Sequence, residues 1–553
     1  MLLLPLPQLV VAQLTPRPIT PEPQPFPQPE LLPPPEELLQ PFPTPQTPEE
    51  PILDIPDTIT ITGFKIIGNT VFSLEEIRAL LQDYINRPIS FNELLETPQI
   101  ITQLYRDRGY ITSGAFLPPQ QLDQGVITLE IIEGQVEEIE IQGLERLKPN
   151  YIRSRIEAGI QPPLNQNQLL ETLQLLQLNP LIERLAVELS AGSQVGLSQL
   201  QIQLQEADAL SVELAIDNQR SPSVGSVRRL GTIHHYNLMG WGDHFQVSYY
   251  NTDGSHTLDN LSYSFPINGK NGTLSFRHRR TDSQIIEDPF NELDIESNSQ
   301  SYEFSFRQPF YLTPTTEFAM GLITSLQDSQ TFLEAEPFQL SRGANNEGET
   351  RVVVLRFFQD YSTRSPQDAL AVRSQFSIGL DALNSTVNQN EPDSRFLNWR
   401  GQAQYLRLIA PETLWLVRAD LQLSDQSLLA QEQFSLGGAT NVRGYRQDLL
   451  LGDQGIFLST EFRVPLLQVE EWNLLLQVIP FVDWGMIGNK EASEEMELDQ
   501  TILSSVGLGM KLQMSDYLIA QLDWGIPLTE IETVGDSWQE KGLHFSILYQ
   551  VNF

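Results

Sequence analysis

The chain has 553 residues and a formal net charge of −37, from 71 acidic and 34 basic side chains. Such an acidic balance argues against a nucleic-acid-binding surface. The absence of cysteine excludes disulfides, thiolate catalysis and cysteine-based metal sites. His234 and His235 would point to opposite faces of a strand, and the other histidines are scattered, so we expect no metal cluster.

The first part of the chain predicts a leader and a tether. Residues 1–12 are apolar and end in Val10-Val11-Ala12, which resembles the back half of a secretory signal peptide without its basic front region. Residues 13–57 are crowded with proline, so we expect an extended, polyproline-like linker. No uninterrupted apolar run reaches the ~18 residues of a membrane-spanning helix. A membrane crossing would therefore require a closed barrel.

Residues 58–134 and 135–208 repeat one order of elements, namely strand, helix, helix, strand, strand. In the first copy, TITITGFKIIGNTVFS alternates as a half-buried strand, and Ser73 with Glu76 forms a capping box that opens a helix. A second helix is expected over about 91–108, before strands in YITSGAF and GVITLEIIEG. A unit of roughly 75 residues, used twice, predicts two small α+β modules.

From residue 209 to residue 553 helical periodicity gives way to alternation. We identify sixteen segments of about ten residues, and an even number of such segments is the signature of an outer-membrane barrel. They begin near residues 211, 227, 243, 256, 273, 300, 316, 350, 370, 397, 413, 455, 474, 503, 517 and 542. A soluble β-sandwich also alternates, but sixteen segments in series favour the membrane.

The faces and connections of these segments support the same interpretation. In IFLSTEFRV, Leu458 and Phe462 are expected to face lipid, and Ser459, Glu461 and Arg463 to face the lumen. When the segments are numbered from the first, the connections from an even-numbered segment to the next odd-numbered one are short. Several of the connections from an odd-numbered segment to the next even-numbered one are long. Outer-membrane barrels have short periplasmic turns and longer outer loops, so this parity places the N-terminal modules in the periplasm.

Two short motifs stand out within the expected barrel. GGATNVRGYRQ (437–447) lies in the long connection between the eleventh and twelfth segments, and FVDWG (481–485) lies in the thirteenth. The alternation places Asp483 on the inward face. The glycines of the first motif would let the backbone turn sharply and approach the wall closely.

These motifs resemble the polypeptide-transport barrels, and GNTVF, YRDRGYITSGAFLPPQ and GVITLEIIEGQVEEIEIQG resemble the POTRA domain. From about residue 58 to its end the chain resembles a two-partner secretion transporter of the hemolysin secretion/activation (TpsB) type. The resemblance implies a membrane β-barrel of 16 antiparallel strands preceded by two α+β POTRA-like domains. Relatives often carry an N-terminal helix that plugs the barrel, and the proline-dense start of this chain departs from that pattern.

The resemblance also implies which residues matter. In this superfamily the loop folds into the lumen, where its arginine meets the acidic residue of the strand motif, so Arg443 is expected to pair with Asp483. If that pair is wet it would contribute only ~0–1 kcal/mol, whereas removing one partner of a desolvated pair costs ~3–5 kcal/mol. The implied residues are Val442, Arg443, Gly444 and Tyr445 of the loop, Phe481, Asp483 and Gly485 of the strand, and the terminal Phe553 as an assembly signal.

The implied function is export of a large, β-helical exoprotein (TpsA-like, of the hemolysin or filamentous-adhesin kind), captured unfolded by the POTRA-like domains in the periplasm. Outer-membrane lipid and, during biogenesis, the barrel-assembly machinery are the other expected partners. We expect no enzyme activity and no cofactor, because no nucleotide site or catalytic constellation is evident. The alternatives are a barrel-assembly insertase of the same superfamily, a porin-like diffusion channel, and a surface-bound enzyme on a barrel. Having two modules instead of three to five argues against the insertase, and the modules with the VRGY loop argue against the porin.

Overall fold

The structure is a computed structural model that describes residues 58–121, 125–389, 392–490, 501–533 and 535–553. The expected signal peptide (1–12) and proline-rich linker (13–57) lie outside the described residues. Near residue 208 the chain divides into two compact units. Among the described residues, no helix is long and apolar enough to cross a membrane.

The first module is a small sheet packed against helices. Its elements are β1 (Ile59–Thr60), β2 (Gly63–Ile67), α3 (Leu74–Leu80), η1 (Gln82–Tyr84), β3 (Pro88–Ile89), α4 (Phe91–Asp107), β4 (Gly114–Phe116) and β5 (Val126–Ile132). β5 is the central strand, parallel to β2 and antiparallel to β4. Ser73 caps α3 by accepting a hydrogen bond from the Glu76 N–H, and Ser90 with Glu93 forms a full capping box at α4.

The start of this module differs from the single strand that the sequence predicted. The strand is split, because β1 pairs with β3 in a separate ribbon while β2 joins the main sheet. The break falls at Ile61, whose side chain is fully buried and whose carbonyl accepts a hydrogen bond from the Asn86 N–H at 2.8 Å. The alternation of buried and exposed side chains therefore runs on through Ile61, but strand pairing stops there and resumes at Gly63.

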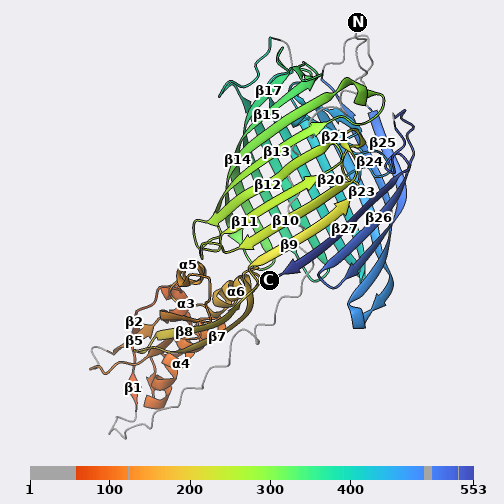
Figure 1. Ribbon diagram of the computed structural model, residues 1–553. Helices are drawn as coiled ribbons and strands as arrows, with labels where there is room; N and C mark the ends of the chain where they lie inside the picture. Colours follow the sequence, from red (N-terminus) through yellow and green to blue (C-terminus); the bar gives the residue numbers. More distant parts are fainter. Residues whose placement is uncertain (1–57, 122–124, 390–391, 491–500, 534) are drawn as a thin grey trace. The chain divides into compact units, whose positions relative to one another are not determined.

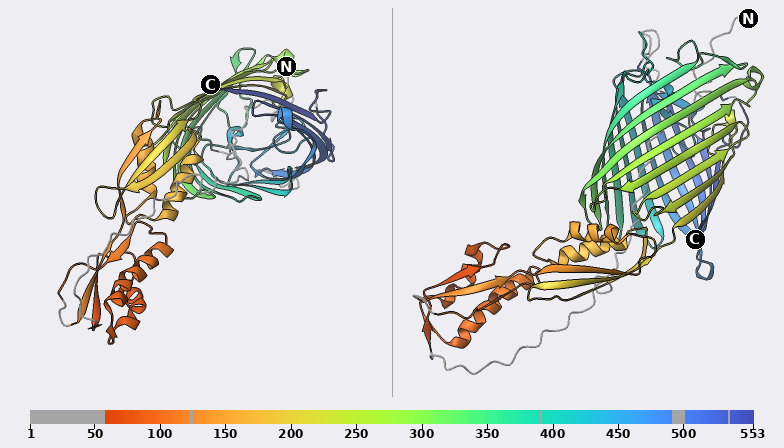
Figure 2. Two further views of the ribbon diagram at one scale, coloured as in Figure 1. Left: turned by 90° about the horizontal axis from the view of Figure 1, so that it is seen from below. Right: turned by 60° about the vertical axis from the view of Figure 1, so that its left-hand side comes forward.

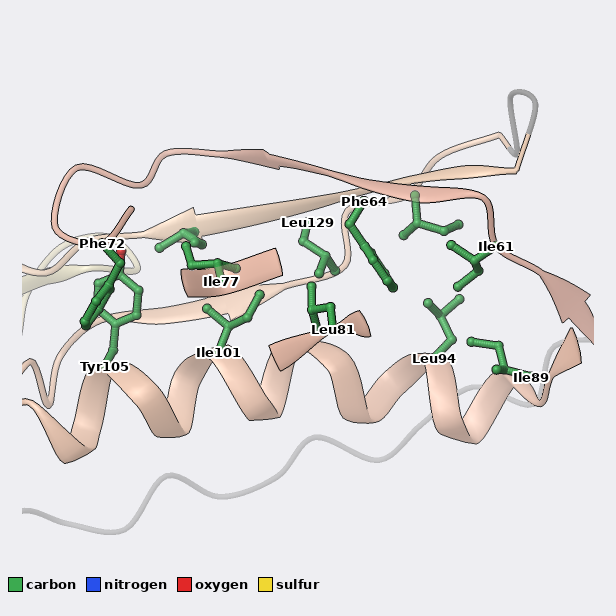
Figure 3. Close-up of a cluster of buried hydrophobic side chains, with 12 residues drawn as sticks. Ile61, Phe64, Phe72, Ile77, Leu81, Ile89, Leu94, Ile101, Tyr105 and Leu129 are labelled. Atoms are coloured by element: carbon green, nitrogen blue, oxygen red, sulfur yellow. The ribbon is translucent and has the colours of Figure 1, made fainter. Parts of the chain in front are cut away.

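The core of the first module lies between α4 and the sheet. Figure 3 shows Leu94 and Ile101 rising from one face of α4 toward Phe64 and Leu129 of the strands. On the same face, Tyr105 lies beside Phe72. The three side chains of α4 are buried, and the helix presents them at the spacing of one apolar stripe. The stripe fixes α4 against the sheet, in which β2 and β4 are the outer strands.

The second module repeats the element order of the first. It consists of β6 (Gln135–Gln142), α5 (Pro149–Gly159), α6 (Gln166–Gln177), β7 (Ile182–Ala191) and β8 (Leu197–Glu206). The sheet order is β6-β8-β7, so β8 is central and β6 and β7 are edges. Backbone hydrogen bonds join the two modules, from the Gln166 N–H to the Gly109 carbonyl at 2.8 Å and from the Leu164 N–H to the Gly134 carbonyl at 2.6 Å.

The second unit is a closed antiparallel barrel, and its sixteen wall strands confirm the expected fold class (Figure 1). Each strand pairs with the next along the chain, and β27 closes the ring on β9. The wall strands are β9 (Leu210–Asp217), β10 (Arg228–Tyr236), β11 (His244–Asn251), β12 (Ser255–Pro266), β13 (Thr273–Gln284), β14 (Ile295–Leu312), β15 (Thr316–Leu333), β17 (Glu349–Arg364), β18 (Asp368–Leu380), β19 (Leu397–Ala410), β20 (Thr413–Ser424), β23 (Gln454–Val469), β24 (Leu474–Gly488), β25 (Thr501–Met514), β26 (Leu518–Pro527) and β27 (Leu543–Asn552). A two-residue strand, β16 (Glu336–Pro337), adds to the end of β15.

The strands begin close to their predicted positions but several run longer than expected. β14 begins at Ile295, where the sequence predicted residue 300, and β14 and β15 each have 18 residues. The alternation of polar and apolar residues marks only the part of a strand that faces lipid. Backbone pairing continues beyond that part, for example at Ser297 with Thr331, where both side chains are polar.

The two faces of the wall separate as predicted. Leu458 and Phe462 of β23 are exposed on the outside, whereas Ser459 and Glu461 between them are buried inside the barrel. An apolar outer surface and a polar interior are what a barrel in a lipid bilayer requires. The interior polar side chains therefore face the space in which any cargo or loop must lie.

Candidate functional site

A loop from residue 425 to 453, between β20 and β23, lies within the ring of wall strands (Figure 2, left view). It contains a short helix, η4 (Ala430–Glu432), and two short strands, β21 (Phe434–Leu436) and β22 (Leu450–Gly452). β21 pairs antiparallel with β22, so the loop is a hairpin whose tip carries the VRGY motif. We call residues 425–433 the root of this loop and residues 437–449 its tip.

Arg443 at the tip contacts Asp483 on the inward face of β24. Its Nε donates to Asp483 Oδ2 at 2.8 Å and its Nη2 donates to Asp483 Oδ1 at 3.0 Å. The Arg443 backbone N–H also donates to Oδ2, at 3.1 Å. A bidentate guanidinium–carboxylate contact fixes orientation as well as position. The exposed fraction of the Arg443 side chain is 2% and that of Asp483 is 0%, so this pair is desolvated.

Two further carboxylates surround the same guanidinium. Arg443 Nη1 donates to Glu461 Oε2 at 2.9 Å and lies 3.9 Å from Asp523 Oδ1. The ring of Phe481 stacks beneath it, with the guanidinium carbon 3.5 Å from the ring centre. One loop arginine therefore contacts acidic side chains of β23, β24 and β26, and Arg463 adds a second positive charge beside Glu461. The same arginine covers an aromatic ring that would otherwise face the lumen.

Residues next to Arg443 also hold the tip of the loop against the barrel wall. The Tyr445 hydroxyl donates to the carbonyl of Ser504 at 2.8 Å and accepts a hydrogen bond from the Thr529 N–H at 3.0 Å. Val442 is fully buried in an apolar cluster that joins the hairpin to the wall. The members of this cluster are Phe434, Leu436, Val442, Tyr445, Leu449, Leu450, Phe457, Ile487 and Leu503.

Glycines allow the tip to lie directly on the wall. Gly437, Gly438 and Gly444 have φ angles of +101°, +113° and +96°, which side-chain-bearing residues rarely adopt. A Cβ added to Gly525 of β26 would lie 2.6 Å from the backbone nitrogen of Gly444. At Gly485 on β24 a Cβ would lie 2.8 Å from the side chain of Leu436. Both wall glycines thus make space for the loop.

The structure shows that two further loop residues, Arg446 and Glu432, form ion pairs that the sequence did not reveal. Arg446, directly after the motif, contacts Glu287 at 2.7 Å and Glu540 at 3.1 Å, on two other connections of the barrel. At the root, Glu432 contacts Arg356 of β17 at 2.6 Å. These partners are distant in sequence and no local pattern links them. The sequence indicated these ion pairs only in a general way, because it places basic and acidic residues on the inward side of strands and next to the VRGY motif.

Phe553, the residue expected to act as an assembly signal, lies at the seam of the barrel, where β27 meets β9. Its N–H donates to the Leu210 carbonyl at 2.8 Å, and the Leu210 N–H donates to the Phe553 carbonyl at 3.1 Å. Its side chain is exposed on the outer surface. The terminal residue therefore takes part in closing β27 against β9.

A hydrophilic cavity of about 690 Å³ adjoins the loop within the barrel. Arginines from several strands line it, among them Arg228, Arg279, Arg400 and Arg463. Within the described residues, no group of three or more histidines or carboxylates is arranged to hold a metal ion. The interior thus combines a folded-in loop with a water-accessible polar space.

A closed membrane barrel with a folded-in VRGY loop, preceded by small α+β modules, defines an outer-membrane protein transporter. The sequence profile described as "Haemolysin secretion/activation protein ShlB/FhaC/HecB" matches residues 196–512, and that described as "POTRA domain, ShlB-type" matches residues 59–134. The chain belongs to the haemolysin secretion/activation family. This result confirms the family predicted from the motifs, and with it an outer-membrane location with the POTRA region in the periplasm.

Curated relatives and solved structures agree with this assignment. The chain is 23% identical over 461 residues to the heme/hemopexin transporter protein HuxB of Haemophilus influenzae, covering 79% of this chain and 78% of that protein. It is 24% identical over 453 residues to the outer membrane transporter CdiB of Dickeya dadantii, covering 79% and 77%. These relatives are transporters, and members of the family secrete a partner exoprotein across the outer membrane.

The structural comparison separates two kinds of barrel. CdiB from Escherichia coli matches with a TM-score of 0.70 at 18% identity, covering 91% of this chain and 93% of the other. BamA from Haemophilus ducreyi lacking POTRA domains 1–3 matches with a TM-score of 0.52 at 13% identity, covering 89% and 100%. The fold is therefore more similar to that of the CdiB transporter than to that of BamA.

Proposed function

We propose that the chain exports a large, β-helical exoprotein, which its periplasmic modules capture unfolded and its barrel passes to the cell surface. Membership of a family of exoprotein transporters supports the general role. The arrangement that carries the more specific proposal is the buried Arg443–Asp483 contact, which holds a loop inside the barrel, where an exported chain must pass. Passage of a polypeptide requires this loop to move.

Sheet edges in the second module suit a partner that arrives unfolded. β6 and β7 are both edge strands, and an unpaired edge binds an extended peptide through backbone hydrogen bonds with little demand on sequence. β6 carries Glu137, Glu138 and Glu140 and has a bulge after Val136, features that discourage strand addition. β7 likewise carries Glu183, Arg184 and Glu188 and has a bulge after Ile182, so both edges remain part of the proposal.

The loop motif supports a plug that is stable but can be released. Removing one partner of a buried ion pair costs ~3–5 kcal/mol, enough to keep the loop in place almost all the time. In this proposal the exported chain displaces the tip, which requires it to bind the state with the released loop more favourably than the closed state by more than that amount. The Arg443–Asp483 ion pair is the lock, meaning the contact that must break before the loop can move. Val442 and Tyr445 hold the tip against the wall. Gly444 and Gly485 allow the loop and the wall to approach closely.

Two other partners belong to the proposal. Outer-membrane lipid surrounds the apolar outer face, on which residues such as Leu458, Phe462 and Tyr549 are exposed. The barrel-assembly machinery reads the C-terminal strand, whose last residue, Phe553, closes the seam with an exposed side chain.

Deleting the gene and comparing secreted and outer-membrane proteins by mass spectrometry tests the function. Loss of one or two large exoproteins, restored by a plasmid-borne copy and accompanied by an unchanged membrane inventory, is the expected result. Broad depletion of other outer-membrane barrels would contradict the proposal and favour an insertase.

A further inference from the structure

The root of the loop is attached to a different part of the wall from its tip. Leu428 and Leu429 pack against Val352 and Val354 of β17, with Phe396 completing an apolar cluster. The Gln431 side-chain amide donates to the Thr350 hydroxyl of the same strand at 2.5 Å. The root is therefore a segment bound to β17, although it follows directly from β20.

A buried ion pair is the polar centre of this attachment. Arg356 Nη2 donates to Glu432 Oε1 at 2.6 Å, and the exposed fractions of the two side chains are 8% and 7%. Both partners have further support from β15, because Arg356 Nη1 donates to the Ser325 hydroxyl at 2.5 Å and the Gln327 amide donates to Glu432 Oε1 at 3.0 Å. The Glu432 carbonyl accepts a hydrogen bond from Gln422 of β20 at 2.9 Å.

This pair fixes the starting point of the hairpin. β21 begins two residues after Glu432, and its pairing with β22 sets the direction in which the tip extends. β17 is the eighth wall strand and β24 the thirteenth, so the root and the tip contact separate sectors of the ring. The hairpin thus bridges the interior between Arg356 on one sector and Asp483 on another, with a buried ion pair at each end.

We propose that Arg356 and Glu432 form a second lock, which positions the root so that Arg443 reaches Asp483. Apolar side chains of similar volume could hold the root equally tightly, whereas an ion pair fixes its orientation. Orientation is what a hairpin needs if its tip is to deliver a bidentate arginine to one carboxylate. This inference rests on the proposed function of the loop and adds a positioning pair outside the known motifs.

The absence of cysteine makes the chain suited to a labelling test. Ser505 on β25 pairs with Asp483 across the sheet, and its side chain is fully buried on the same inward face. A Ser505→Cys variant places one thiol beside the tip's contact site. The rate at which a water-soluble maleimide labels this thiol in the purified, detergent-solubilised full-length protein then reports how often the tip leaves the wall.

The variants are Glu432→Gln, Arg356→Gln and the double Glu432→Gln/Arg356→Gln, each combined with Ser505→Cys. We expect each single change to raise the labelling rate about tenfold or more, because a buried charge loses its partner and the root loses its orientation. We expect the double variant to label no faster than the faster single variant, since both changes remove one interaction. The exchange Glu432→Arg/Arg356→Glu is expected to bring the rate back toward that of the parent.

Two controls separate this role from a general loss of stability. Arg228→Gln removes a partly buried ion pair of similar geometry, at 2.8 Å from Asp217, that joins two wall strands. It is expected to leave the labelling rate unchanged. Every variant is also checked for the shift in gel mobility on heating that a folded barrel shows, and only folded protein is labelled.

The outcomes distinguish the inference from the proposed function on which it rests. Arg443→Ala in the same background must raise labelling if the tip lock exists. If Arg443→Ala raises labelling while the Glu432 and Arg356 variants match the parent, the second lock is refuted and the tip lock stands. If the root variants raise labelling and Arg443→Ala does not, the root pair holds the loop and the proposed tip lock is refuted. A double variant whose effect is the product of the two single effects would also overturn the pairing.

Discussion

Asp483 accepts three hydrogen bonds from Arg443, two from the guanidinium and one from the backbone N–H, at 2.8, 3.0 and 3.1 Å. The Asp483 carboxylate thus contacts both the charged side chain and the backbone of Arg443. Asp483 also accepts a hydrogen bond from the Ser459 hydroxyl at 2.6 Å. Because this carboxylate has no exposure to water, the contact cannot be replaced by solvation while the loop is in place.

Arg443→Ala is expected to destabilise the seated loop by ~3–5 kcal/mol, because Asp483 and Glu461 lose a common buried partner. Arg443→Lys retains the charge but not the planar fork, so we expect an intermediate effect. Ion conductance of the purified protein in planar lipid bilayers measures the change as a rise in the open fraction. A conductance of Arg443→Ala equal to that of the parent, with the barrel folded, would contradict this expectation.

Close packing between Gly444 and Gly525 gives a second prediction. Gly525→Ala would bring a methyl carbon to 2.6 Å from the Gly444 nitrogen, so the tip must lift from β26. We expect a loss of ~1–3 kcal/mol in loop seating and a rise in conductance. Gly231→Ala is the matched control, because the nearest atom to its added methyl is 3.8 Å away on the side chain of Leu214. Equal conductance of these two variants would show that the tip does not rest on β26.

The first module contains a carboxylate whose ionisation stabilises it. Glu133 accepts hydrogen bonds from the Tyr105 hydroxyl at 2.7 Å, from the Thr70 N–H at 2.7 Å and hydroxyl, and from the Val71 N–H at 3.2 Å. Partial burial opposes the charge, but the bonds from Thr70 and the others outweigh it and hold the pKa of Glu133 below its usual range.

This lowered pKa predicts a pH dependence in one direction. A carboxyl whose pKa is lower in the folded state contributes its full stabilisation above its unfolded pKa of about 4.3 and loses it as the pH falls through the folded value. We expect hydrogen exchange in residues 58–134 of the full-length protein, corrected for intrinsic rates, to quicken below about pH 4.3. Glu133→Gln should exchange faster at neutral pH and respond less to acid, and a variant with the parent's full acid response would assign the effect elsewhere.

The terminal residue is expected to act during assembly more than in the finished fold. Phe553→Ala should lower the amount of folded protein in the outer membrane, measured by the heat-dependent gel shift, while the protein that does assemble melts near the parent temperature. The reason is that its side chain is 64% exposed and packs little, whereas its backbone closes the seam. Phe310→Ala, with a side chain 65% exposed on β14, is the control and should assemble normally.

Much of the barrel could be predicted from the sequence, for a physical reason. A wall strand has lipid on one side and polar space on the other, so its side chains must alternate, and alternation is directly visible in the residues. The start of β23, predicted near residue 455 and found at Gln454, illustrates how closely the pattern follows the structure. It fails in residues 296–301 of β14 (ESNSQS), where every side chain is polar, because backbone pairing continues there without any alternation of polar and apolar residues.

The interior contacts could be predicted only where a motif named both partners. Arg443 and Asp483 each sit in a recognisable string, and their meeting follows from the resemblance. Glu432 and Arg356 are 76 residues apart and neither lies in a motif. Their contact depends on where the root packs after the whole ring has closed, which is a property of tertiary structure that local patterns do not encode.

Maleimide labelling of Ser505→Cys in living cells, with and without the exoprotein identified by the deletion experiment, tests the central claim most directly. The claim is that cargo displaces the tip of the loop from the wall. We predict slow labelling in cells that lack the partner and distinctly faster labelling in cells that are exporting it. Equal labelling in the two strains, while export proceeds normally, would show that the loop stays seated during transport and would contradict the account.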